Sequence, residues 1–265
     1  MKPYKQAERE KRDRAAAGYD EWYRRTKGER FDVYERRLFD EAVPGSGSLR
    51  VLDLGSGTGR IARSLAQRTA LVAVDLSIPS LILNREAQGI PAVVADSRDL
   101  PFHDGTFDVI VSCQVLQHLL DDDLQATMLA CHRALAREGR LVFSVYNLEA
   151  AGNHRVRQRG GDSGGVHRWF TGADLHSLAE RSGFRVQGIQ RYKALPRRLE
   201  PIPGWERIDR FISTTPLMGR YATRYLLATF RRDDLPTPAA SRTGASATRR
   251  THTNGPAEAR RQGST

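Results

Sequence analysis

The chain contains little of what stabilises disulfide-rich, metal-dependent or membrane-spanning proteins. It has only two cysteines in 265 residues. Cys113 and Cys131 both fall in the apolar patterns of a core strand and a core helix, which argues against a disulfide scaffold or a zinc site. No run approaches the roughly 20 apolar residues of a membrane span, and the N-terminus is charged where a secretory signal requires an apolar centre. The sequence therefore predicts no bound metal, no membrane span and a reducing, cytoplasmic location.

Positive charge is plentiful but unevenly distributed. The formal net charge is +11. Residues 38–150 nevertheless contain nine Lys and Arg against fourteen Asp and Glu, whereas residues 151–230 contain fourteen against six. The excess suits either a solvated basic face or an acidic partner, such as an acidic substrate, a membrane surface or RNA. No RNA-recognition motif or zinc knuckle accompanies it.

Three glycines follow the first strongly apolar run of the chain. Residues 51–60 read VLDLGSGTGR, with glycines at positions 55, 57 and 59. Glycine at such places lets the backbone adopt conformations barred to other residues and brings amide groups close to a ligand. The dinucleotide-binding fingerprint requires its third glycine at position 60, where Arg60 stands. The spacing therefore argues against a nicotinamide-dependent oxidoreductase.

Further apolar runs that end in polar residues follow at regular intervals. Residues 71–75 (LVAVD) and 92–96 (AVVAD) are expected strands, each ending in an aspartate, and residues 107–114 (FDVIVSCQ) are expected as a fourth strand. The segment VLQHL at 115–119 comes next, and residues 133–143 have the pattern of a helix end, a glycine and a fifth strand. This alternation of strand and helix is typical of a parallel sheet.

Taken in order, these segments resemble the class I S-adenosylmethionine (SAM) dependent methyltransferases. The pattern D-x-G-x-G-x-G, with Asp53 two residues before Gly55, is similar to motif I of that family. Residues 107–119 (FDVIVSCQVLQHL) are similar to its FDxIxxxxVLxHL stretch. The resemblance implies an α/β fold with a doubly wound, Rossmann-like sheet of seven strands, mostly parallel with an antiparallel last strand, and helices on both faces. It also implies SAM as the cofactor.

The resemblance gives the acids and the glycine turn separate roles. The turn would hold the methionine end of SAM, and Asp96 would bind the adenine amino group. A carboxylate at the position of Asp75 can accept hydrogen bonds from both ribose hydroxyls. Two of these roles have an open alternative. Asp53 either contacts the cofactor amine or only fixes the glycine turn. Asp96 either contacts adenine or caps the turn that follows it. The expected cofactor-binding residues are Asp53, Gly55, Ser56, Gly57, Gly59, Asp75, Leu76, Asp96 and Ser97, together with Ser112 and Gln114, which would line the pocket through backbone groups.

Aromatic residues and histidines complete the expected site. Tyr19 and Tyr23 would fold over the cofactor as a lid, because an aromatic face attracts a sulfonium; an ordinary amphipathic helix is the alternative. For a hydroxyl acceptor, a base helps to remove the proton, and imidazole suits neutral pH. His118, after the fourth strand, is the first candidate, with a structural role as its alternative. His167 is the second candidate.

The pattern divides the chain into three parts. Residues 1–45 are an expected helical cap or lid, residues 46–232 the methyltransferase domain, and residues 233–265 a disordered tail whose composition cannot bury a core. Within the domain, the glycine-rich, basic residues 150–168 are expected as a mobile loop. Residues 195–220 are expected as an insertion over the substrate site. The insertion carries four apolar residues at helical spacing, which are Trp205, Ile208, Phe211 and Ile212.

These features favour methyl transfer to a small-molecule acceptor or to a lipid- or sugar-linked intermediate, because the insertion has the pattern of a cover over a closed pocket. An acidic acceptor suits the basic second half of the chain. Two alternatives stay open: tRNA or another RNA as the acceptor, which the VLQHL segment and the basic excess both suit, and a SAM-binding protein that has lost catalysis. The sequence is compatible with a monomer or a homodimer.

Overall fold

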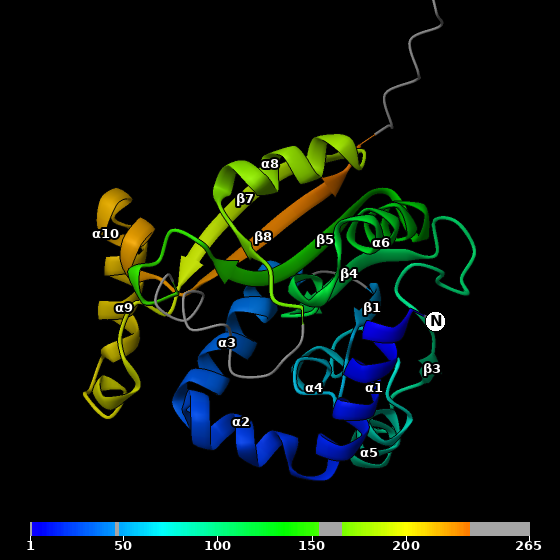
Figure 1. Ribbon diagram of the computed structural model, residues 1–265, viewed down its shortest axis with the longest axis horizontal. Helices are drawn as coiled ribbons and strands as arrows, with labels where there is room; N and C mark the ends of the chain where they lie inside the picture. Colours follow the sequence, from blue (N-terminus) through cyan, green and yellow to red (C-terminus); the bar gives the residue numbers. More distant parts are fainter. Residues whose placement is uncertain (1, 46–47, 154–165, 234–265) are drawn as a thin grey trace, which may run out of the picture. The chain divides into compact units, whose positions relative to one another are not determined.

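A twisted, mostly parallel sheet lies at the centre of the computed structural model, which describes residues 2–45, 48–153 and 166–233 (Figure 1). Seven strands follow the order β3-β2-β1-β4-β5-β8-β7, and an eighth, β6, pairs with β5 off this path. All pairings are parallel except those of β8 with β5 and with β7. The strands are β1 (Arg50–Leu54), β2 (Ala70–Asp75), β3 (Ala92–Val94), β4 (Phe107–Cys113), β5 (Leu135–Asn147), β6 (Trp169–Phe170), β7 (Phe184–Tyr192) and β8 (Tyr225–Arg232).

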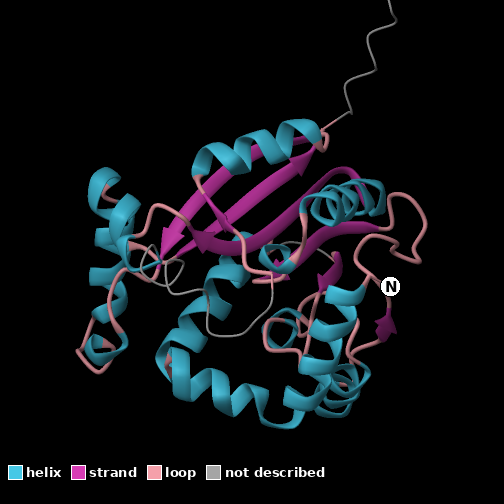
Figure 2. Ribbon diagram, in the orientation of Figure 1, coloured by secondary structure: helices cyan, strands magenta, loops and turns pink. Residues whose placement is uncertain are grey.

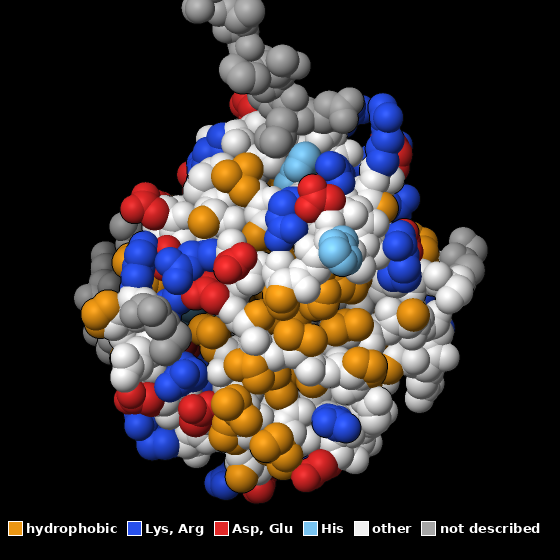
Figure 3. Space-filling model, turned by 90° about the vertical axis from the view of Figure 1, so that its right-hand side faces the viewer, with side chains coloured by type: hydrophobic (Ala, Val, Ile, Leu, Met, Phe, Trp, Pro, Cys, Tyr) orange, Lys and Arg blue, Asp and Glu red, His pale blue; other side chains and the backbone are white. Residues whose placement is uncertain are grey.

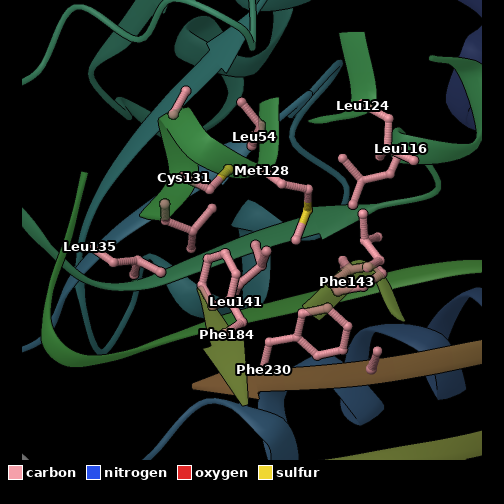
Figure 4. Close-up of a cluster of buried hydrophobic side chains, with 14 of the residues drawn as sticks. Leu54, Leu116, Leu124, Met128, Cys131, Leu135, Leu141, Phe143, Phe184 and Phe230 are labelled. Carbon is pink, nitrogen blue, oxygen red and sulfur yellow. The ribbon is translucent and has the colours of Figure 1, made fainter. Parts of the chain in front are cut away.

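Helices cover both faces of the sheet (Figure 2). One buried cluster joins α6 and α8 to the sheet, with Leu124, Met128 and Cys131 of α6 packed near Phe143 and Phe230 (Figure 4). A second cluster joins α3, α4 and α5 to the opposite face. The helices are α1 (Pro3–Ala15), α2 (Tyr19–Lys27), α3 (Glu29–Ala42), α4 (Ala62–Leu65), α5 (Ile78–Gln88), α6 (Asp121–Ala134), α8 (Gly172–Arg181), α9 (Trp205–Thr214) and α10 (Pro216–Ala222), with the 3-10 turns η1 (Ala16–Gly18), η2 (Leu116–His118) and η3 (Arg197–Leu199).

The predicted architecture is confirmed, with differences in detail. The doubly wound sheet and its antiparallel last strand are present, but β6 is an additional two-residue strand beyond the seven expected. Helix α6 ends at Ala134, because Leu135 already pairs with Phe107 of β4. The N-terminal helical region is broken at η1, and Gly28, with φ 112°, separates α2 from α3.

The described residues belong to one compact unit. Most of the expected mobile loop and nearly all of the expected disordered tail, residues 154–165 and 234–265, lie outside the described residues. Over the described ranges, no helix combines the length and the apolar composition needed to cross a bilayer.

The insertion after β7 differs from the expected cover. Trp205 is buried, and its ring meets Tyr34 of α3 edge-on at 5.4 Å between centroids. Ile212 is partly buried. Ile208 and Phe211, in contrast, are exposed on the outer side of α9. The apolar spacing therefore predicted a helix correctly, but two of its four apolar side chains do not close over a pocket.

Candidate active site

The glycine turn between β1 and α4 has a distinct requirement at each of its three glycines. All three have positive φ, with values of 73° at Gly55, 55° at Gly57 and 82° at Gly59. A Cβ at Gly55 would lie 2.3 Å from Cγ2 of Val115, and a Cβ at Gly59 would lie 2.2 Å from Oδ1 of Asn84. A Cβ at Gly57 would meet no atom within 4 Å. Gly55 and Gly59 are thus needed for packing, and Gly57 faces open space where a ligand can approach.

Asp75, at the end of β2, directs its carboxylate at this turn. Its Oδ2 accepts a hydrogen bond from the Gly57 amide (2.8 Å) and its Oδ1 accepts one from the Ser77 amide (2.8 Å). Each carboxylate oxygen can accept a second hydrogen bond. Burial raises the pKa of Asp75, which is the expected cost of an anion held ready for two hydroxyl donors. The arrangement fits the ribose diol of SAM. The next residue, Leu76, is partly exposed.

Asp53 has a more internal position than Asp75. It is 2% exposed, and its Oδ2 accepts a hydrogen bond from Ser56 Oγ (2.7 Å), while Asn84 donates to the same Ser56 hydroxyl (2.9 Å). Burial raises the pKa of Asp53 to about 7. These contacts favour the alternative in which Asp53 and Ser56 fix the glycine turn. A direct contact of Asp53 with the cofactor stays a prediction.

Helix α1 lies over the position expected for adenine. Lys5 Nζ donates to Asp96 Oδ1 at 2.6 Å, although Lys5 is only 3% exposed. The Arg98 amide donates to the same oxygen (3.0 Å), as a capped turn requires, and its guanidinium reaches Oδ2 (2.9 Å). Although burial opposes it, Arg98 and Lys5 lower the pKa of Asp96. An adenine amino group that binds Asp96 would therefore have to replace Lys5. The neighbouring Ser97 hydroxyl forms a hydrogen bond with the Thr127 hydroxyl (2.8 Å).

The two candidate catalytic histidines are brought together, although 48 residues separate them in the chain. The rings of His118 and His167 meet edge-on with centroids 5.0 Å apart. His118 Nδ1 lies 3.1 Å from the carbonyl oxygen of Val166. Because a carbonyl only accepts, Nδ1 carries the proton and Nε2 keeps a free lone pair. Burial, reinforced by Arg12, lowers the pKa of His118 to about 4, so this imidazole is neutral at pH 7.

Beneath the site, a buried charge network ties α3 to the ends of β4 and β7. Glu35 is fully buried and accepts hydrogen bonds from Tyr23 Oη (2.6 Å), Tyr192 Oη (2.7 Å) and Gln114 Nε2 (3.0 Å). Arg60 Nη2 donates to Oε2 (2.7 Å), the oxygen that also accepts from Tyr23, and the Arg60 guanidinium lies 4.0 Å from the Tyr23 ring centroid. Although burial opposes it, Arg60 and the two tyrosines lower the pKa of Glu35.

This network and its surroundings hold one residue that was expected in a lid, Tyr23. They also hold Ser112 and Gln114, whose backbone groups were expected to line the pocket, and that role stays a prediction. Tyr23 is 2% exposed beneath Arg60, so it is a core residue rather than half of a lid. The Gln114 side chain turns away toward Glu35, and its backbone adopts a positive φ of 57°. Ser112 is fully buried and donates to the carbonyl oxygen of Leu54 (2.9 Å). Tyr19 remains partly exposed, and its lid role stays a prediction.

Aromatic side chains form a wall where the carboxyl end of β5 meets the short strand β6 and the amino end of the antiparallel β8. Tyr146 stacks on Trp169 (6.0 Å between centroids) and on Tyr225 (5.5 Å). Lys27 Nζ donates to Tyr225 Oη at 3.3 Å. His167 lies beside the wall, 6.1 Å from Trp169. The wall therefore runs from the two histidines, past the partly exposed rings of Tyr146 and Trp169, to the buried Tyr225 and the Lys27 ammonium.

Sequence reasoning missed Lys5, Glu35, Arg60 and the aromatic wall. A signal existed for Glu35, because it lies on the apolar stripe of α3 with Phe31 and Leu38, where an acid must find a buried partner. None existed for Lys5, since its partner is 91 residues away. In the described part of the chain, no group of three or more His, Cys, Asp or Glu could hold a metal ion.

Comparison with known proteins agrees with this geometry. The family described as Methyltransferase domain matches residues 52–143, which run from β1 into β5. The malonyl-[acyl-carrier protein] O-methyltransferase of Geobacter sulfurreducens is 33% identical over 188 residues, covering 65% of this chain and 67% of that protein. The demethylmenaquinone methyltransferase of Thermus thermophilus is 28% identical over 205 residues, covering 74% of this chain and 84% of that protein.

A solved structure shares the fold. The crystal structure of Burkholderia thailandensis 1,6-didemethyltoxoflavin-N1-methyltransferase, with bound 1,6-didemethyltoxoflavin and S-adenosylhomocysteine, superposes with a TM-score of 0.59 at 20% identity. The match covers 88% of this chain and 92% of that chain. Together with the glycine turn and the strand-end acids, these similarities establish SAM as the cofactor. The chain belongs to the class I SAM-dependent methyltransferases.

Proposed function

We propose that this methyltransferase acts on a small acceptor whose nucleophile is an acidic oxygen, such as a carboxylate or an acidic phenol. The acceptor would lie between the histidine pair and the aromatic wall of Tyr146, Trp169 and Tyr225. The observation that carries the proposal is that the wall joins two groups: the neutral His118, through His167, at one end, and at the other end the ammonium group of Lys27, which no carboxylate of the described chain neutralises.

The state of His118 favours an acceptor that needs little help to lose its proton. An imidazole whose conjugate acid has a pKa of about 4 holds a proton weakly. It is therefore a poor general base for an alkyl hydroxyl, because proton transfer would be strongly uphill. A carboxylate arrives already ionised at neutral pH. For such an acceptor Nε2 need not remove a proton, and its lone pair can accept a hydrogen bond from a donor group elsewhere on the bound molecule.

The remaining residues align the acceptor and exclude water. SAM supplies the electrophilic methyl group on its sulfonium, and transfer is an in-line displacement in which alignment accounts for much of the rate. The stacked rings of Tyr146 and Trp169 suit a planar or apolar acceptor body. Lys27 supplies the charge that attracts an anionic group, and its contact with Tyr225 fixes its direction. Two relatives are named as methyltransferases of malonyl-[acyl-carrier protein] and of demethylmenaquinone. These names are compatible with an oxygen or a ring acceptor.

The experiment is a transfer assay with labelled SAM and matched acceptors. We expect transfer to aromatic carboxylates or acidic phenols and little transfer to alkyl alcohols of the same size. Lys27→Gln should raise KM for the anionic acceptor about tenfold, as expected for a charge-assisted contact, and leave the Kd for SAM unchanged. Arg24→Gln, an exposed change on the same helix, is the control. Preferred transfer to alkyl alcohols, or an unchanged KM in Lys27→Gln, would contradict the proposal.

A further inference from the structure

The insertion after β7 presents an unusual outer surface. Six large apolar side chains in residues 202–221 are between 45% and 71% exposed, with Phe211 at 70% and Leu217 at 71%. On α9, Ile208 and Phe211 are three residues apart and share one stripe; on α10, Leu217 and Tyr221 are four apart and do the same. Helices α9 and α10 form an outlying pair at the left edge of Figure 1. The exposed apolar residues are Ile202, Ile208, Phe211, Leu217, Met218 and Tyr221.

The inner side of the same segment is firmly anchored, so the outward apolar face is a stable feature. Asp209 is fully buried and accepts hydrogen bonds from the amides of Lys193 (3.1 Å), Ala194 (2.8 Å) and Leu195 (2.8 Å). A Cβ on Gly219 of α10 would lie 2.2 Å from the carbonyl oxygen of Ser213, which shows how closely the two helices pack. Rotating α9 to bury Phe211 would break these contacts.

Positive charge predominates in this segment. Between residues 197 and 224 the chain has six arginines and three acids. Two of the acids, Glu200 and Asp209, are buried, and the third, Glu206, is paired with Arg37 of α3 (2.5 Å). Arg207 and Arg224 are exposed, and neither forms a salt bridge with any described residue. The segment therefore combines exposed apolar side chains with two unneutralised arginines, Arg207 on α9 and Arg224 just after α10, whereas Arg210 and Arg220 pair with Glu41 and Glu149.

We propose that the outer face of α9 and α10 docks the enzyme on an anionic lipid surface. Apolar side chains that enter the interface and arginines that pair with anionic headgroups are the two requirements for such docking. The apolar side chains and Arg207 are on the two helices, and Arg224 follows α10 by two residues. A second face, on the side of α1, α5 and β3, also exposes apolar side chains, but it has few charged side chains among them (Figure 3). It therefore lacks the second of the two requirements. The inference is independent of the acceptor proposed above.

The test is co-sedimentation of the full chain with vesicles of phosphatidylcholine alone or with about one third phosphatidylglycerol. We expect binding to the anionic vesicles that weakens as salt is raised. Phe211→Ser/Leu217→Ser should weaken it at least tenfold, and Arg207→Gln/Arg224→Gln should do so by roughly fivefold for each arginine. Ile82→Ser, a 50% exposed residue on α5, is the matched control and should bind as the parent does.

Each other outcome counts against docking on lipid. The arginines beyond residue 234 are present in every variant, so the difference between variants reports on α9 and α10. Unchanged SAM binding in the variants verifies that they are folded. Equal binding to neutral and anionic vesicles, no binding, or equal loss in Ile82→Ser would overturn the proposal. So would a dimer in light scattering that Phe211→Ser dissociates, or arginine-dependent retention on bulk tRNA without vesicle binding.

Discussion

Replacing Glu35 by glutamine tests whether the buried network holds the N-terminal helices on the catalytic domain. Glu35 is fully buried and accepts from four donors, of which Arg60 carries a full charge. In Glu35→Gln one carboxylate oxygen becomes an amide that faces those donors, and Arg60 keeps only Asp32 as its acid (2.8 Å). Loss of one partner from a buried ion pair costs about 3–5 kcal/mol. That is a large part of a total stability of about 5–15 kcal/mol.

The assay is urea unfolding followed by circular dichroism at pH 7 and at lower pH. Because the folded-state pKa of Glu35 lies below its unfolded value, the charged carboxylate stabilises the fold above the unfolded pKa, and this contribution is lost as the pH falls through the folded pKa. The deficit of Glu35→Gln should therefore shrink in acid. Arg60→Met should cost less in the Glu35→Gln background than alone, because the two residues share one network.

Glu41→Gln is the matched control, since Glu41 is on the same helix and exposed. It should change the free energy of unfolding by no more than about 0.5 kcal/mol. The reasoning is refuted if the free energy of unfolding of Glu35→Gln lies within about 1 kcal/mol of the parent value at pH 7. It is also refuted if the losses of stability in Glu35→Gln and Arg60→Met are additive.

Three further predictions concern the cofactor crevice. Asp75→Asn should raise the Kd for SAM at least tenfold, as loss of a charge-assisted hydrogen bond of about 1.5–3 kcal/mol requires; calorimetry at pH 7 measures it, and an unchanged Kd excludes the ribose contact. Gly55→Ala should lower Tm more than Gly57→Ala, because both strain a positive φ but only the first meets a side chain at 2.3 Å; equal Tm values would contradict the packing argument. Lys5→Met should tighten SAM binding at low salt by about fivefold, the size of a weak ion pair, and an unchanged Kd would show that Lys5 does not compete at Asp96.

The sheet could be predicted because its signals are local. Each of the first, second and fourth strands is a short apolar run next to a glycine or an acid, and the structure has them at β1, β2 and β4. Strand β6 has only two residues and depends on pairing with Tyr146 and Asn147 of β5. A two-residue segment is too short to show the hydrophobic periodicity that predicts a strand. Only its tertiary pairing with β5 makes it one.

Side-chain directions were harder to predict than strand ends. Gln114 follows β4 at the crevice, as expected, yet its amide pairs with Glu35, which is 79 residues away in the chain. Tyr23 was expected as a lid from its spacing with Tyr19, but its hydroxyl serves the same carboxylate. In both cases a polar group donates to a buried carboxylate instead of facing the crevice. An unpaired buried carboxylate would cost more free energy than a lost surface contact.

The N-terminal helices differ in how strongly they are held, and this decides which of them can move. Helix α3 buries Phe31, Tyr34, Leu38 and Phe39, each contributing about 1.5–3 kcal/mol when removed from water. Helix α1 buries only Lys5 and reaches the site through ion pairs, which contribute much less. Regions with few buried apolar contacts open at the lowest free energy. Because α1 holds Asp96 through Lys5, we expect cofactor entry to displace α1 about η1 while α3 stays fixed on the sheet.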